Sequence, residues 1–138
     1  MKKINQRKKY QSQWAGQFYA AAELTRRGYL ISLTLGNAPR SDLLAVSPKG
    51  TQFKVQVKGQ AVQSSWLVQN VDKREKNLYW IFVYLPKPEN ESPKFFILDN
   101  REMAKGWRTD PNPRYRYPSG SYWSYVSQYE NHWKSLPR

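Results

Sequence analysis

The segment 40–58 constrains the fold of this chain most strongly, because its pattern predicts a β-hairpin. Residues 42–46 form a short apolar run that opens with an acid, and residues 53–58 alternate strictly between apolar and polar side chains. Pro48 and Gly50, which are typical turn residues, lie between the two runs. The alternation predicts a strand with one face toward a core and one polar face.

The register of this hairpin determines which side chains meet. If Val46 pairs with Gln52 across the turn, Asp42 lies opposite Gln56, and directly opposed residues have Cβ atoms about 5 Å apart. Strand side chains alternate, so Asp42, Gln56 and Lys58 share one face. A slip by one residue would move Asp42 to the other face. The predicted register therefore places an acid, an amide and an ammonium group together at one end of the hairpin.

Length and composition restrict the class of protein. A chain of 138 residues that is 39% hydrophobic and 15% aromatic is long and apolar enough for one domain with a real core. The sequence contains no cysteine, and the single His132 cannot form a histidine-rich zinc site. We find no apolar run of the roughly 20 residues that a membrane helix needs, and no signal peptide. We therefore expect a cytoplasmic protein without a membrane partner.

The formal net charge of +13 favours a polyanionic partner, because lysine and arginine neutralise phosphates and release counterions. We expect that partner to be nucleic acid. The candidate phosphate contacts are Arg40, Lys54, Lys73, Arg74, Arg114 and Arg116. Two other interpretations stay open: a basic, solvated surface, and an interaction module whose exposed aromatic residues bind a protein.

Residues 10–27 predict a helix, because apolar residues recur there at helical spacing. The residues expected on its buried side are Tyr10, Trp14, Phe18, Ala21 and Thr25, with Ala22 and Leu24 beside them. Gln17 falls within this arc, where it is either a functional group or a satisfied amide at the edge of the stripe. Gly28 is a natural C-cap, and residues 1–9 predict a frayed basic arm.

The remaining elements complete an α/β pattern. Strands are predicted at residues 29–35, 78–85 and 94–98, a short strand or helical turn at 65–69, a charged connector at 71–77, an irregular loop at 109–120 and a last helix at 121–135. Residues 78–85 are apolar on both faces, which predicts a central strand. Asp99 and Glu102 resemble a capping box for a short helix. The order predicts a single α/β domain, residues 1–138, with a mixed central sheet flanked by helices.

Helix, strand, aspartate and then a strand with (acid or amide)-x-Lys resembles the core of the PD-(D/E)XK nuclease superfamily. The residues that carry the resemblance are 16–18, 22–24, 28–29, 42–44 and 56–58. The Gln-x-Lys form resembles the Mrr-like branch, and the layout is also similar to resolvase-like and homing endonuclease cores. The resemblance covers residues 14–100 and leaves residues 101–138 outside it as an aromatic and basic C-terminal extension.

The resemblance implies a restriction-endonuclease-like core that binds Mg²⁺ or Mn²⁺ and hydrolyses DNA phosphodiesters, in a defence system or a mobile element. Asp42 then corresponds to the metal-binding aspartate and Lys58 to the catalytic lysine. Gln56 stands where an acid is usual, and Gln17 stands where resolvase-like members carry a helix glutamate. Gln56 and the Val57 carbonyl would supply neutral oxygen ligands beside Asp42.

Two of the usual acids are amides in this chain, so the metal is expected to be weakly held. This leaves an alternative function open: a nuclease-fold DNA-binding protein that no longer cuts. One active site per chain predicts a homodimer or higher oligomer for cutting both strands. The recognition sequence, the cut geometry and the choice among DNA, RNA and branched DNA are not determined by these patterns.

Overall fold

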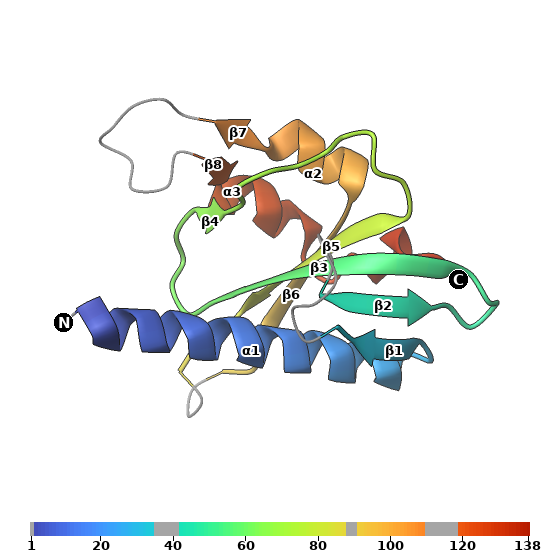
Figure 1. Cartoon of the computed structure of the whole chain (residues 1–138), viewed down its shortest axis with the longest axis horizontal. Helices are drawn as coiled ribbons and strands as arrows, with labels where there is room; N and C mark the ends of the chain where they lie inside the picture. Colours follow the sequence, from blue (N-terminus) through green and yellow to red (C-terminus); the bar gives the residue numbers. More distant parts are fainter. Residues whose placement is uncertain (1, 35–41, 88–90, 110–118) are drawn as a thin grey trace.

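The computed structural model describes residues 2–34, 42–87, 91–109 and 119–138 (Figure 1). Its main sheet has the order β1-β2-β3-β5-β6. The strands are β1 (Leu30–Leu33), β2 (Leu43–Val46), β3 (Gln52–Gln60), β5 (Leu78–Tyr84) and β6 (Lys94–Asp99). β3 and β5 are parallel and the other neighbours are antiparallel, so the predicted α/β fold with a mixed sheet is confirmed.

The predicted hairpin register is confirmed. Val46 pairs with Gln52, and the pairing continues to Leu43 opposite Val55. Gly50 has φ +93, a conformation that glycine adopts without steric cost, and this permits the tight turn. β2 spans only Leu43–Val46, and its first residue lies opposite Val55. β3 continues past this point to Gln60. The second half of β3 therefore has β5 as a neighbour on one edge and no β2 residue opposite on the other.

Helix α1 (Lys2–Arg26) covers one face of the sheet, and α2 (Asn100–Gly106) and α3 (Trp123–Val126) lie on the other side (Figure 1). Gly28, with φ +99, closes α1 as predicted: its N–H and that of Tyr29 bond to carbonyls of the last helical turn. The predicted frayed arm is wrong for residues 2–9, which continue the helix. This stretch contains neither Gly nor Pro, so nothing local stops the helix from propagating toward the N-terminus.

The predicted buried stripe of α1 is wrong for its aromatic residues. Among the described residues of α1, the buried ones are Gly16, Gln17, Ala20 and Leu24, of which Gln17 and Leu24 were expected in or beside the stripe. Tyr10 and Phe18 are instead 71% and 54% exposed. A Cβ on Gly16 would lie 3.0 Å from the Cα of Gly59, so the helix and β3 approach too closely for a large ring. Where α1 crosses Gly59, side-chain size rather than hydropathy therefore selects the buried residue.

The core has two halves, one on each face of the sheet. The half under α1 is mainly aliphatic and includes Leu24, Leu43, Val55, Val57, Ile81 and Ile97. The other half is rich in aromatic residues and includes Trp66, Trp80, Phe82, Phe96 and Met103. β5 contributes to both halves, which confirms its internal position.

The C-terminal third differs from the predicted helix at 121–135. It forms α3 and two 3₁₀ turns, η1 (Ser127–Tyr129) and η2 (Trp133–Ser135). Glu130 leaves the helical conformation to bridge Phe96, and Asn131 has φ 55, which ends helix propagation. The capping box is confirmed: Asp99 accepts from the Glu102 N–H, and Glu102 accepts from the Asp99 N–H.

A second, three-stranded sheet has the order β4-β8-β7. Its strands are β4 (Trp66–Leu67), β8 (Ser119–Ser121) and β7 (Arg108–Thr109), so the segment 65–69 contains a strand and no helical turn. Arg40, Arg114 and Arg116 fall outside the described residues. Among the residues that are described, no helix is both long and apolar enough to cross a membrane.

Candidate functional site

The candidate site forms where β2 stops and β3 continues. There, two side chains take the place of a neighbouring strand along the β3 edge. The Val57 N–H donates to Asp42 Oδ2 at 2.8 Å, and the Val57 carbonyl accepts from Gln13 Nε2 at 2.9 Å. Gln13 Oε1 also accepts from the Gly59 N–H at 3.2 Å. The backbone groups of this edge are thus satisfied by an acid from the hairpin and an amide from α1.

Asp42 and Lys58 share the sheet face opposite α1. Leu43 and Val55 form a pair and both enter the core under α1, so the alternating side chains of Asp42, Gln56 and Lys58 turn the other way. Burial raises the pKa of Asp42, against the hydrogen bond from Val57 and the charge of Lys58. Burial lowers the pKa of Lys58, and the Asp42 charge opposes this shift. The two groups are therefore partly desolvated and stabilise each other's charged form.

Gln56 and Lys58 line a cavity of about 380 Å³. Its other walls come from the indole of Trp80 and from the connector that precedes β5, including Asp72 and Glu75. The structure thus brings two further carboxylates to the cavity that holds the predicted amide and lysine. Neither was predicted, because the connector at 71–77 is separated from β3 in sequence and only the fold brings it back.

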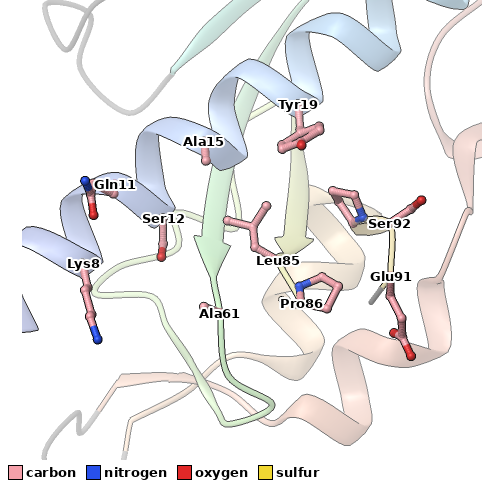
Figure 2. A pocket seen from close by; sticks show the side chains of 11 residues that line it. Lys8, Gln11, Ser12, Ala15, Tyr19, Ala61, Leu85, Pro86, Glu91 and Ser92 are labelled. Carbon is pink, nitrogen blue, oxygen red and sulfur yellow. The ribbon is translucent and has the colours of Figure 1, made fainter. Parts of the chain in front are cut away.

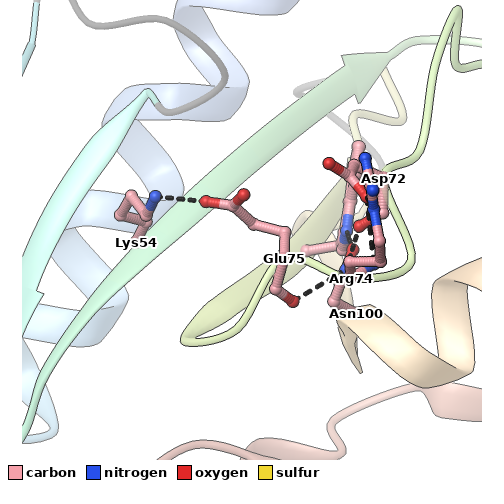
Figure 3. Close-up of polar contacts among 6 residues, drawn as sticks. Lys54, Asp72, Arg74, Glu75 and Asn100 are labelled. Atoms are coloured by element: carbon pink, nitrogen blue, oxygen red, sulfur yellow. Dashed lines mark hydrogen bonds and ion pairs between the residues drawn. The ribbon is translucent and has the colours of Figure 1, made fainter.

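The buried Asn100 fixes this connector to the sheet. Its Nδ2 donates to the carbonyls of Asp72 and Glu75, at 2.8 and 3.1 Å, and its Oδ1 accepts from the Trp80 indole N–H at 2.9 Å (Figure 3). Asn100 is 5% exposed, so these bonds satisfy a buried amide that would otherwise be costly. The wall of the cavity is consequently held by the start of α2.

Two predicted phosphate contacts form ion pairs within the chain. Lys54 Nζ pairs with Glu75, and Arg74 Nε lies 3.3 Å from Asp72 Oδ1 (Figure 3). Both basic side chains are exposed, and such pairs contribute about 0–1 kcal/mol. Because these ion pairs are weak, a phosphate can compete with Glu75 and Asp72 for the two basic side chains. Lys73, the third predicted contact in this region, is exposed beside them.

The predicted helix residue, Gln17, is 8% exposed and lies on the sheet-facing side of α1. The residue that contacts Val57 is Gln13, one helical turn earlier. Gln13 was not predicted, although residues four apart share a helix face and its spacing from Gln17 could have indicated this second amide.

The oxygen donors at this edge are compatible with a weakly held Mg²⁺ or Mn²⁺. Asp42 and the Val57 carbonyl each use one acceptor position within the protein, and both kinds of group have further lone pairs. Gln56 adds an amide oxygen. Within the described part of the chain, no group of three or more His, Cys, Asp or Glu side chains is placed to hold a metal ion. One carboxylate beside an ammonium group predicts low affinity.

A larger cavity, of about 820 Å³, lies on the other flank of α1 (Figure 2). Ser12, Ala15 and Tyr19 line it from the helix, and Leu85 and Pro86 line it from the end of β5. Among the described residues that line it, none is a predicted site residue, and the charged ones are Lys8 and Glu91.

Comparison with protein-family models, with curated proteins and with solved structures found no match for this chain.

Proposed function

We propose that this protein is a metal-dependent endonuclease that hydrolyses DNA phosphodiesters through a PD-(D/E)XK-like core. The observation that carries the proposal is the shared position of Asp42 and Lys58 on one sheet face, beside the Val57 peptide. The net charge of +13 supports a polyanionic substrate.

Lys58 is the group that acts on the phosphate. Its ammonium group lies in a partly desolvated position, where electrostatic interactions are stronger than in water. It stabilises the negative charge that develops on the phosphate oxygens in the transition state, and Asp42 keeps it protonated. Gln13 holds the Val57 peptide, and so holds the strand from which Lys58 projects.

Asp42, Gln56 and the Val57 carbonyl would hold the divalent ion. When bound, the ion would supply Lewis-acid stabilisation of the phosphate. The resemblance assigns Gln17 a water-orienting role, but Gln17 is buried on the sheet-facing side of α1 and does not line the cavity that holds Gln56 and Lys58, so we assign it no role in this proposal. One site per chain leads us to propose a homodimer or higher oligomer, acting in the cytoplasm as part of a defence system or a mobile element.

A second candidate function is DNA binding without cleavage. It is favoured by one observation, the amide contact of Gln13 with the Val57 carbonyl, which occupies part of the oxygen ligand set. Under this function Asp42 and Gln13 serve to close the β3 edge, and Lys58 contacts phosphate.

Incubation with supercoiled plasmid and Mg²⁺ or Mn²⁺ tests the proposal. We expect nicking or cutting that chelator stops, and a rate about 100- to 1000-fold lower for Lys58→Ala, the range for removing one group that stabilises the transition-state charge. The matched control is Lys49→Ala, which removes an equal charge from the exposed hairpin turn and should cut normally. Wild-type protein that binds the plasmid but leaves it intact with either metal supports the second function instead.

A further inference from the structure

Helix α1 carries an exposed aromatic face that the core does not use. Tyr10, Trp14 and Phe18 follow one another at four-residue spacing, so they project from one side of the helix and span about 12 Å along it. Tyr10 is 71% exposed and Phe18 is 54% exposed. The Trp14 and Phe18 rings are stacked, with centroids 5.6 Å apart and an angle of 30° between their planes. We refer to these three rings as the ring face.

The ring face belongs to the helix that contacts the β3 edge of the candidate site. Gln13, which bonds to Val57 and Gly59, belongs to the same helical turn as Tyr10 and Trp14. Figure 1 shows that the amino-terminal half of α1 extends beyond β1 and β2.

The charge around the ring face identifies the partner. Arg7 precedes Tyr10 by three residues, which places it on the same side of the helix, and it is exposed. Between residues 7 and 26 the helix has four bases and one acid, and that acid, Glu23, is already bonded to Arg26 and Arg27. A second copy of this chain would bring like charges together. A polyanion would instead bring opposite charges to these bases.

We propose that the ring face binds unpaired nucleotides. The rings stack on exposed bases while Arg7 contacts the phosphate backbone, a combination that binds single strands with little sequence preference. Bases in a duplex are stacked on each other and offer no free face to a ring. The inference rests on the proposed function in one respect, namely that the substrate is nucleic acid, and it adds that this substrate contains a single-stranded or unpaired region.

Fluorescence anisotropy tests this inference apart from cleavage. The probes are a labelled DNA single strand and the duplex of the same sequence, titrated in chelator with protein that also carries Lys58→Ala, so that no strand is cut. Phe18→Leu keeps the apolar side chain but removes the ring, and Trp14→Ala removes the stacked partner. The matched control is Tyr19→Ala, which removes a ring of similar exposure, 47%, from the flank of α1 that lines the larger cavity.

We expect Phe18→Leu and Trp14→Ala each to weaken single-strand binding by about 5- to 100-fold, the range for losing one base–ring contact. Duplex binding and the Tyr19→Ala variant should be unchanged. Single-strand affinity of Phe18→Leu equal to that of the parent protein, or an equal loss for the duplex, would overturn the inference. A dimer that dissociates in these variants, with unchanged single-strand affinity, would assign the ring face to a second copy instead. Plasmid cleavage by the wild type is measured in a different assay. A failure of the endonuclease proposal is therefore distinguishable from a failure of the ring-face proposal.

Discussion

The two sides of helix α1 differ in what they contact and in the side chains that they use. The sheet-facing side combines Leu24 with small residues and amides, and Gln13 on this side bonds to the β3 edge at the candidate site. Another side carries the ring face, in which Tyr10 and Phe18 are exposed and Trp14 is half-buried. Close approach between Gly16 and Gly59 explains why no ring packs at this crossing, since a large side chain does not fit there. The difference teaches that the most apolar side of a helix is not its packing side when the partner strand approaches this closely.

The strongest test of this comparison is Gly59→Val. A Cβ at position 59 would meet the Ser12 carbonyl and would lie 3.2 Å from the Gly16 Cα, both backbone atoms that cannot move aside. We expect a loss of about 3 kcal/mol in the free energy of unfolding, at the upper end of the usual cost of overpacking. Urea denaturation measures it. A loss below about 0.5 kcal/mol, the range of neutral surface changes, would show that the helix does not pack this tightly.

A smaller loss is expected for Gln13→Leu. This change leaves the Val57 carbonyl and the Gly59 N–H without their partners, at about 2 kcal/mol for buried polar groups left unsatisfied. The matched control is Gln11→Leu, an equal change at an exposed position of the same helix. Thermal or urea unfolding of both variants gives the difference. Equal stability of the two would contradict the role of Gln13 at the β3 edge.

Gln56→Glu sharpens the assignment of the site to a metal ion. An added carboxylate attracts a divalent cation and offsets the Lys58 charge, with part of the gain cancelled by repulsion from Asp42 and by desolvation. We expect Mn²⁺ to bind about tenfold more tightly, which is about 1.4 kcal/mol. Calorimetric titration measures the affinity, and Gln52→Glu, an exposed position further along β3, is the matched control. If Asp42→Ala leaves wild-type binding unchanged, these residues do not hold the metal.

The smallest effect on stability is expected for Phe18→Ala. A side chain that is 54% exposed contributes little to the core, so the free energy of unfolding should change by about 0.5 kcal/mol or less. Differential scanning calorimetry or urea denaturation detects a larger change. A loss of several kcal/mol would place the ring face in the core and remove the contrast between the two sides of α1.

Several local features could be predicted because each depends on a few neighbouring residues. The hairpin register follows from the turn at Gly50 and from alternation in β3, and this was sufficient to put Asp42 on the face of Gln56 and Lys58. The capping box at Asp99 and the helix end at Gly28 are also short-range patterns. The proposed catalytic residues therefore come from a part of the chain whose geometry is locally encoded.

The sequence by itself determined the order of the main-sheet strands, the mixed α/β class and the shared face of Asp42 and Lys58, because alternation and turn chemistry act over short distances. Only the tertiary structure decided which side of α1 is buried, since that depends on how closely β3 approaches. It alone brought Gln13 to Val57, and Asn100 to the connector that lines the cavity. These contacts join residues that are 44 and 28 positions apart, and no local pattern encodes a pairing over such distances.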